Sequence, residues 1–118
     1  MFNILVVDDQ AHIRRLYEYT LEKNGYKPYT AGDGAEALRL LENTHIDLVI
    51  LDLMMPTMDG YAFLKTLRDN GSSIPVLIIT ARDSAQDIRK SFLMGTDDFM
   101  VKPVDDVEMI LRIRALLR

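Results

Sequence analysis

The sequence predicts an α/β fold: a five-stranded parallel sheet with helices on both faces. The chain has 118 residues, the length of a single domain. Short runs rich in Val, Ile and Leu recur along it, separated by helix-length stretches with apolar spacing near 3.6. Strands that are apolar throughout and alternate with helices are typical of a parallel sheet covered on both faces.

The strands are predicted from these apolar runs. The four strong runs are residues 3–7 (NILVV), 47–51 (DLVIL), 75–79 (PVLII) and 98–101 (DFMV). A weaker run, KPYT at 27–30, follows the turn-like residues NGY and supplies the remaining strand. Five strand–helix units in 118 residues fit a doubly wound, flavodoxin-like (βα)5 sandwich with strand order 2-1-3-4-5.

The helices are predicted from residues that share an apolar face. In chain order, the five faces are Ile13, Leu16, Tyr17 and Leu21; Ala37, Leu38 and Leu41; Phe63, Leu64 and Leu67; Ile88 and Phe92; and Met109, Ile113 and Leu116. Asp33 and Glu36 form a capping pair at the start of the second helix, and Gly95 marks the end of the fourth.

Composition excludes several classes of protein. The net charge of −4 argues against a domain built mainly to bind nucleic acid, but not against a DNA-binding domain elsewhere in a longer protein. The absence of cysteine excludes disulfides and thiolate chemistry and is compatible with a reducing cytoplasm. The start MFNILVVDDQ lacks a basic region, and all apolar runs are strand-sized, so no signal peptide or membrane span is expected.

Polar side chains stand at the carboxyl ends of four predicted strands. Asp8 and Asp9 follow the first strand, Asp52 the third, Thr80 the fourth and Lys102 the fifth. Ligands of such sheets bind outside these strand ends. A lone Asp there is more often a helix cap or a turn residue, but the joint occurrence is harder to obtain from capping. We expect one functional rim.

The residue types at this rim indicate phosphoryl chemistry. Carboxylates held close together repel one another, and a divalent cation relieves the repulsion. A set of oxygen ligands without His or Cys suits Mg²⁺. Lys102 can meet one phosphoryl oxygen and Thr80 can donate a hydrogen bond to another. Asp52, on the middle strand, is then the candidate nucleophile, and its product is an aspartyl-phosphate.

Four segments, VVDD, LVILDLMMPTMDG, LIITA and DDFMVKP, resemble the receiver domain of two-component response regulators. The resemblance spans essentially the whole chain, so residues 1–118 are expected to form one receiver domain. It implies that Asp52 accepts a phosphoryl group from a phosphohistidine of a sensor histidine kinase. Such a domain is not an enzyme in the usual sense, although it catalyses its own phosphorylation and dephosphorylation.

The resemblance also assigns ligands at the rim. Asp9, Asp52 and the backbone carbonyl of Met54 would bind Mg²⁺ directly, and Asp8 would act through water. Thr80 and Lys102 would hold the phosphoryl oxygens. The Met54 and Arg82 side chains flank the path of attacking water and are predicted to set how long the phosphate survives, without affecting whether it forms.

The resemblance assigns a conformational switch as well. Thr80 would move toward the phosphoryl group, and Phe99, at the position of the family's switch aromatic, would rotate from an exposed to a buried position. The surface formed by the fourth helix, the fifth strand and the fifth helix would change in response. The Lys102–Pro103 peptide bond is expected to be cis.

The output surface resembles that of OmpR/PhoB-type regulators, which dimerise through it. Asp98 and Arg112 stand where an ion pair between subunits is expected, Glu108 is a second charged member, and Met94 and Leu111 contribute an apolar patch. Two positions depart from this pattern, Ile88 and Ser91. We expect a phosphorylation-dependent homodimer that controls transcription through a DNA-binding domain beyond residue 118. The alternative is a stand-alone receiver that relays phosphate or docks on a protein.

Two other classes of protein fit the sequence less well. An aspartate-nucleophile phosphatase of the haloacid dehalogenase type needs a second Asp two residues after the nucleophile, where Met54 stands. A flavodoxin-like cofactor binder needs a phosphate-cradling loop, but DDQAH would repel a phosphate. His12 and His45 are expected to be solvated. The resemblance implies that kinase choice depends largely on the first helix and the loop after the fifth strand, on residues such as Arg14, Arg15, Glu18, Val104 and Asp105.

Overall fold

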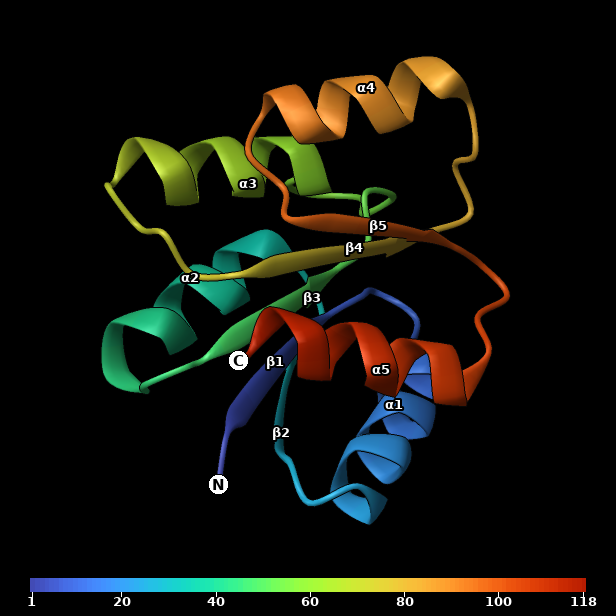
Figure 1. Ribbon diagram of the computed structural model, residues 1–118. Helices are drawn as coiled ribbons and strands as arrows, with labels where there is room; N and C mark the ends of the chain where they lie inside the picture. The colour runs from blue at the N-terminus through green and yellow to red at the C-terminus, as the bar shows by residue number, and fades with distance from the viewer.

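The computed structural model describes all residues, Met1–Arg118, and contains one parallel sheet of five strands (Figure 1). The strands are β1 (Asn3–Val7), β2 (Lys27–Ala31), β3 (Leu48–Leu51), β4 (Val76–Thr80) and β5 (Asp98–Val101). Their order, β2-β1-β3-β4-β5, confirms the order predicted from the sequence. β1 and β3 lie at the centre and are fully covered, which explains why their sequences are apolar without alternation.

Five helices connect the strands: α1 (Ala11–Lys23), α2 (Gly34–Asn43), α3 (Gly60–Asp69), α4 (Ala85–Leu93) and α5 (Asp106–Leu116). Four of them begin at a residue whose side chain accepts a backbone N–H of the first turn: Asp33, Asp59, Ser84 and Asp105. These caps fix where each helix leaves its strand. None of the helices has the length and apolar character that crossing a membrane requires.

Two separate cores hold the helices to the sheet. On one face, α1 and α5 pack against the sheet, and on the other face lie α2, α3 and α4 (Figure 1). The α2–α4 face is centred on Phe63 and Leu64 of α3, and the α1/α5 face on Leu21 and Met109. The alternation of sheet residues between the two cores, such as Leu5 toward one and Ile4 toward the other, explains why both were apolar in the sequence.

The predicted apolar faces of two helices need correction. Leu16 of α1 is 49% exposed and Phe92 of α4 is 47% exposed, although both were expected to face the core. On α4 the fully buried residue is Ser91, one position before Phe92, and its hydroxyl donates to the Asp87 carbonyl at 2.8 Å. α4 therefore presents a polar residue to the sheet, and its apolar Phe92 lies outside.

The amino-terminal edge of the sheet is closed by two aspartates in the same way. Asp47, just before β3, accepts the Asn3 N–H through Oδ2 at 2.7 Å and donates its own N–H to the Asn3 carbonyl. Asp97, just before β5, accepts the Val76 N–H at 2.8 Å and donates to the Val76 carbonyl. Each aspartate thus pairs with the first residues of a neighbouring strand and satisfies an edge N–H.

Candidate functional site

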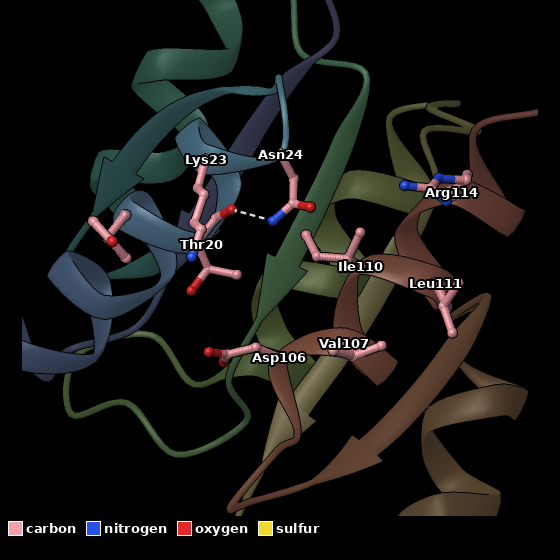
Figure 2. Close-up of a pocket in the computed structure, with 9 residues that line it drawn as sticks. Thr20, Lys23, Asn24, Asp106, Val107, Ile110, Leu111 and Arg114 are labelled. Carbon is pink, nitrogen blue, oxygen red and sulfur yellow. Dashed lines mark hydrogen bonds between the residues drawn. The ribbon is translucent and has the colours of Figure 1, made fainter.

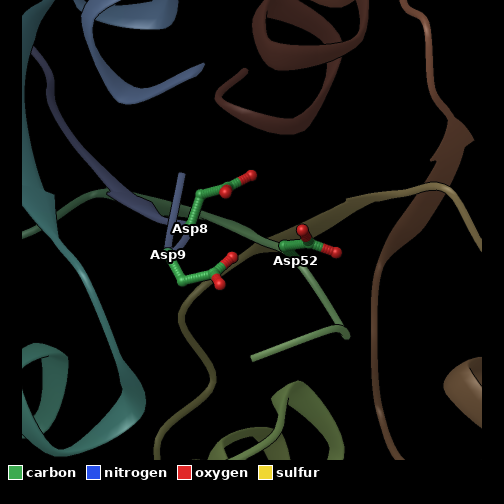
Figure 3. Close-up of side chains that lie close together, drawn as sticks. All are labelled: Asp8, Asp9 and Asp52. Carbon is green, nitrogen blue, oxygen red and sulfur yellow. The ribbon is translucent and has the colours of Figure 1, made fainter. Parts of the chain in front are cut away.

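Three carboxylates meet at the carboxyl-terminal edge of the sheet, where the sequence predicted a functional rim. Asp8 and Asp9 follow β1 and Asp52 follows β3, and Figure 3 shows their side chains converging. One oxygen from each lies within 4.8 Å of the others. Asp8 is 2% exposed and Asp52 is 5% exposed, whereas Asp9 is open to solvent. Two buried negative charges so close together require a compensating cation.

Backbone contacts hold Asp52 in place. Its N–H donates to the Val7 carbonyl at 3.0 Å, which continues the β1–β3 pairing by one residue, and its Oδ1 accepts the Met54 N–H at 3.1 Å. Gly60, the first residue of α3, lies against the same peptide. A Cβ at Gly60 would stand 2.5 Å from the Asp52 carbonyl oxygen and 2.7 Å from the Leu53 Cα. The helix can approach Asp52 this closely only because residue 60 is glycine.

Lys102 connects the two buried carboxylates. Its Nζ donates to Asp8 Oδ2 at 2.8 Å and to Asp52 Oδ2 at 3.1 Å, and its side chain is 16% exposed. Its backbone N–H donates to the Thr80 carbonyl at 2.8 Å, and the Lys102–Pro103 peptide bond is cis. The end of β5 therefore delivers an ammonium group to the carboxylates from across the sheet.

The ionisation of these groups follows from burial and pairing. Burial raises the pKa of the Asp8 carboxyl above its ordinary value, against the lowering effect of the hydrogen bonds from Lys102 and from the Gln10 N–H. Burial alone would lower the pKa of the Lys102 ammonium, but its hydrogen bonds to Asp8 and Asp52 outweigh burial and raise it. The cluster thus favours a charged Lys102 and is short of positive charge.

The predicted switch residues lie next to the cluster. Thr80, at the end of β4, is completely buried, and its Oγ1 accepts the Arg82 N–H at 3.4 Å. Phe99 of β5 is half-buried and packs against the core on the α2–α4 face. β4 and β5 pair with Thr80 opposite Val101 and Ile78 opposite Phe99, so the two predicted switch residues are offset by two residues along neighbouring strands. The movement of Thr80 and the rotation of Phe99 to a buried position stay predictions.

The cluster fits the Mg²⁺ predicted from the sequence. All the side-chain donors are carboxylate oxygens, they come within 4.8 Å of one another, and no His or Cys lies among them. Hard oxygen ligands and partial access to water are what Mg²⁺ requires, and Asp9 supplies the exposed position.

Residues 4–114 match the family described as response regulator receiver domain. This chain belongs to that family. The receiver is 43% identical over 115 residues to the alkaline phosphatase synthesis transcriptional regulatory protein PhoP of Bacillus subtilis, covering 98% of this chain and 48% of that protein. It is 44% identical to the response regulator MprA of a Mycobacterium species, covering 98% of this chain and 50% of that protein. The chain spans about half the length of these curated relatives.

Solved receiver structures have the same fold. The receiver domain of the Francisella response regulator 1452 is 35% identical, with a TM-score of 0.95 over 99% of this chain and 97% of that one. The Thermotoga maritima response regulator TrrA, solved in complex with Mg²⁺ and BeF, is 32% identical, with a TM-score of 0.90 over 99% of this chain and 100% of that one.

The ion pairs of the α4–β5–α5 surface are formed within the single chain, and the pairing expected between subunits stays a prediction. Arg112 was expected to pair with Asp98 of a second subunit. Within the single chain, Arg112 Nη1 donates to both Asp98 carboxylate oxygens at 3.1 and 3.0 Å, and its Nη2 donates to Glu108 Oε1 at 3.0 Å. Met94, assigned to the apolar patch, is half-buried against the core, whereas Leu111 is 54% exposed. Arg112 thus already has both acidic partners without a second chain.

One group of contacts near the site could not be found from the sequence. Tyr61 at the start of α3 donates its hydroxyl to Asp87 Oδ1 at 2.7 Å, and the Arg82 guanidinium donates to the same oxygen at 3.5 Å. Tyr61 and Asp87 are 26 residues apart, and neither belongs to a motif that signals contact. The only sequence indication is that Ser84 and Asp87 have the spacing of a helix cap.

Two clefts border α1 and α5. The larger, about 460 Å³, lies between these helices beside Thr20, Lys23 and Asp106, away from the carboxylates (Figure 2). The smaller, about 340 Å³, is lined by Ile13, Tyr17, Lys102, Pro103 and other residues, and therefore opens beside the site. Burial raises the pKa of Tyr17 to about 12, so its hydroxyl stays protonated there.

The histidines take no part in the site. His12 is exposed on α1. His45 is also exposed, but its Nε2 contacts Asp47 Oδ1 at 2.8 Å, a partner that the sequence analysis did not assign. Both lie outside the carboxylate cluster.

Proposed function

We propose that this receiver accepts a phosphoryl group on Asp52 from a phosphohistidine of a sensor histidine kinase, with Mg²⁺. One observation carries the proposal: the buried Asp8 and Asp52 carboxylates share a single ammonium, Lys102, beside the exposed Asp9. Such a cluster is short of positive charge, which favours binding of a divalent cation. It also presents a carboxylate whose backbone is fixed by β1 and α3.

In the transfer, an Asp52 carboxylate oxygen forms a bond to phosphorus while the phosphorus–nitrogen bond of the donor breaks. The electron pair of that bond returns to the imidazole nitrogen. The Lys102 ammonium already contacts Asp52 Oδ2. It can therefore donate to the phosphoryl oxygens and offset their negative charge when the phosphoryl group is bound to this aspartate. Thr80 contributes a hydroxyl to the same group. The domain acts on its own carboxylate, so we propose that it is not an enzyme in the usual sense.

Asp9, Asp52 and the Met54 backbone carbonyl would hold Mg²⁺ directly, and Asp8 would hold it through water. The ion, when bound, would neutralise charge on the phosphoryl oxygens and the carboxylates. Two of this chain's features support that assignment. The Asp9 carboxylate is exposed and the carboxylate oxygens already converge, so little rearrangement of the backbone is required.

We propose that phosphorylation acts on the α4–β5–α5 surface through Thr80 and Phe99. If Thr80 approaches the phosphoryl group, it leaves space that the half-buried Phe99 can enter. Such a switch requires that the two arrangements of Thr80 and Phe99 have similar free energies. An unchanged Phe99 side-chain conformation in the presence of beryllofluoride would contradict this part of the proposal.

We propose that the phosphorylated domain dimerises through this surface and that the complete protein regulates transcription. The transcriptional regulators among its relatives are about twice as long as this chain, which favours an output domain after residue 118 over a stand-alone receiver. Because Asp98 and Glu108 already pair with Arg112 in one chain, dimerisation would exchange these ion pairs between subunits. Sedimentation with and without beryllofluoride tests this. A protein that stays monomeric both with and without beryllofluoride would exclude this dimer.

Two further assignments belong to the proposal. We propose that the Met54 side chain, which is 50% exposed, and the Arg82 side chain set the lifetime of the phosphate without affecting whether it forms. Exchange of both residues without a change in the dephosphorylation rate would contradict this. We propose that the protein is cytoplasmic, because a receiver that is phosphorylated by sensor kinases and controls transcription works there. DNA would be bound by another domain of the protein, and not by this one.

The central test is direct. The protein is incubated with Mg²⁺ and acetyl phosphate, and the intact mass is measured for the wild type and for Asp52→Asn. We expect the mass of one added phosphoryl group, dependent on Mg²⁺, in the wild type only. Addition without Mg²⁺, or addition that survives the substitution, would overturn the assignment of Asp52.

A further inference from the structure

A polar network joins the start of α4 to the start of α3 beside the phosphoacceptor site. At its centre is the Asp87 carboxylate. Its Oδ1 accepts the Tyr61 hydroxyl at 2.7 Å and its Oδ2 accepts the Ser84 hydroxyl at 2.8 Å. The Arg82 guanidinium also reaches Oδ1, at 3.5 Å. Asp87 therefore holds two short hydrogen bonds from neutral groups and one long contact from a cation.

The members of this network are held unequally. Tyr61 is 7% exposed, and the Lys90 ammonium lies 4.1 Å from the centroid of its ring. Hydrogen bonds, first from Tyr61 and then from Ser84, lower the pKa of Asp87, so it stays an anion. By contrast, the Arg82 side chain is 43% exposed and donates no hydrogen bond other than the one to Asp87. The carboxylate is fixed, and the guanidinium is the part that can leave.

Arg82 has a second place where its charge would be used. It follows Thr80 by two residues, and its backbone N–H contacts the Thr80 hydroxyl at 3.4 Å. β3 and β4 pair with Leu51 opposite Ile78, so Asp52 and Thr80 lie at the same edge of the sheet, and Arg82 follows Thr80 beside that edge. A phosphoryl group on Asp52 would present more negative charge than the single carboxylate of Asp87, so the two anions compete for one guanidinium.

We propose that Asp87, fixed by Tyr61 and Ser84, is a positioning residue that draws Arg82 away from the phosphorylated site and so shortens the lifetime of the aspartyl-phosphate. This inference rests on the proposed function, because it needs a phosphoryl group on Asp52. In hydrolysis, a water oxygen bonds to phosphorus and the bond from phosphorus to the Asp52 oxygen breaks. The carboxylate is regenerated, and the oxygen and both protons of the water leave with inorganic phosphate. A guanidinium over the phosphoryl oxygens obstructs the approach of that water.

The experiment measures how fast the phosphate is lost after acetyl phosphate is removed from the phosphorylated protein, in the presence of Mg²⁺. Asp87→Asn keeps an acceptor for the Tyr61 hydroxyl but removes the charge that attracts Arg82. We expect dephosphorylation to slow by about two- to five-fold, the range that loss of a partly exposed ion pair gives. The matched control is Asp69→Asn. It also removes the charge of an aspartate from an ion pair, the Lys65–Asp69 pair of α3, but that pair does not involve Arg82.

A double-mutant cycle separates positioning from structure. In an Arg82→Gln background, Asp87→Asn should no longer change the rate, because the group that it releases is absent. Asp87→Glu should restore part of the wild-type rate. As a second readout, beryllofluoride should bind Asp87→Asn more tightly than wild type by a similar factor, measured by NMR titration.

The outcomes distinguish this inference from the proposed function. If the wild type is not phosphorylated, the proposed function fails and the inference fails with it. If the wild type is phosphorylated but Asp87→Asn loses phosphate at the wild-type rate, only the inference is overturned. An equal effect of Asp87→Asn with and without Arg82 would likewise overturn it, because Asp87 would then act by another route.

Discussion

The two edges of the sheet treat the same residue type in opposite ways. At the amino-terminal edge, Asp47 and Asp97 each accept a backbone N–H at 2.7 and 2.8 Å, and each has a cationic or imidazole partner as well. At the carboxyl-terminal edge, Asp8 and Asp52 are more deeply buried but share one ammonium. The pKa of Asp47 is lowered, first by the Asn3 N–H, whereas burial raises that of Asp8.

The difference follows from which backbone groups a parallel sheet exposes at each edge. At its amino-terminal edge, unpaired N–H groups point outward and a carboxylate that caps them is satisfied there. At the carboxyl-terminal edge the outward strand groups are carbonyls, so the backbone N–H groups that Asp8 and Asp52 accept come from the loops that follow them, at 2.9 and 3.1 Å, and not from a neighbouring strand. An aspartate at the first edge therefore stabilises the fold. Aspartates gathered at the second edge lower stability until a cation or a phosphoryl group with its counter-charges arrives.

The largest expected effect concerns the backbone that supports the carboxyl-terminal edge. Gly60→Ala places a Cβ 2.5 Å from the Asp52 carbonyl oxygen, so α3 or the nucleophile must move. We expect the free energy of unfolding to fall by about 3 kcal/mol, the upper part of the range for overpacking, and phosphorylation by acetyl phosphate to slow. Urea unfolding measures the first effect. Gly32→Ala, whose Cβ finds its nearest neighbour at 3.4 Å, is the control and should change little.

A second prediction concerns the amino-terminal edge alone. Arg68 of α3 donates to the carbonyls of Gly95, Ser72 and Ile74 at 2.9, 3.0 and 2.8 Å, and to Asp97. Arg68→Met should lower the free energy of unfolding by about 2 kcal/mol, because partly buried acceptors lose their donor. Phosphorylation should proceed at the wild-type rate.

The control for Arg68→Met is a lysine on the same helix. Lys65→Met removes an exposed pair and should cost less than about 0.5 kcal/mol. If Arg68→Met is phosphorylated more slowly than the wild type, the two edges of the sheet are coupled and do not act independently.

A smaller effect is expected at Asp47, and it depends on pH. The pKa of Asp47 in the folded state lies below its ordinary value of 3.8, so the unfolded chain binds the proton more readily. The stability from this group is therefore present above that value and is lost as the pH falls through the folded-state pKa. Asp47→Asn should cost about 1 kcal/mol at neutral pH and nothing at the most acid values. Unfolding curves from neutral pH to below 3.8 test this. A constant difference between variant and wild type would contradict it.

The smallest expected effect has the opposite sign. Asp9→Asn removes one of three crowded carboxylates, an exposed one, so the metal-free protein should gain up to about 1 kcal/mol of stability. The increase in melting temperature that Mg²⁺ gives the wild type should largely disappear. Asp83→Asn, at an exposed aspartate outside the cluster, is the control. If Mg²⁺ stabilises Asp9→Asn as much as the wild type, Asp9 is not a ligand.

The fold and the composition of the rim could be predicted because they depend on local patterns. Apolar runs predicted the strands, and the rule that ligands bind at strand carboxyl ends brought Asp8, Asp52 and Lys102 together before any coordinates. Asp47 and Asp97 could not be recognised in the same way. Each appears in the sequence as a polar residue before a strand, and its role depends on which strand begins beside it.

Side-chain direction was the other limit. On α4, periodicity proposed Ile88 and Phe92 as the inner face, but the helix is turned so that Ser91 lies inside. Its hydroxyl can be buried because the Asp87 carbonyl accepts its hydrogen bond, which no apolar scale anticipates. The sequence also did not predict that Arg112 pairs with Asp98 inside one chain. A surface position in a sequence does not reveal which chain supplies the partner of a charged side chain.

The burial of Ser91 in place of a larger apolar residue has a thermodynamic consequence for α4. The heat capacity change of a conformational transition comes mainly from apolar surface that gains or loses water. Since α4 buries only a serine fully and is tied to α3 by the Tyr61 hydroxyl on Asp87, its displacement would expose little apolar surface. An equilibrium between two positions of this helix should therefore show a nearly constant enthalpy over temperature. The enthalpy difference between the two positions of α4 would then be nearly the same at low and at high temperature.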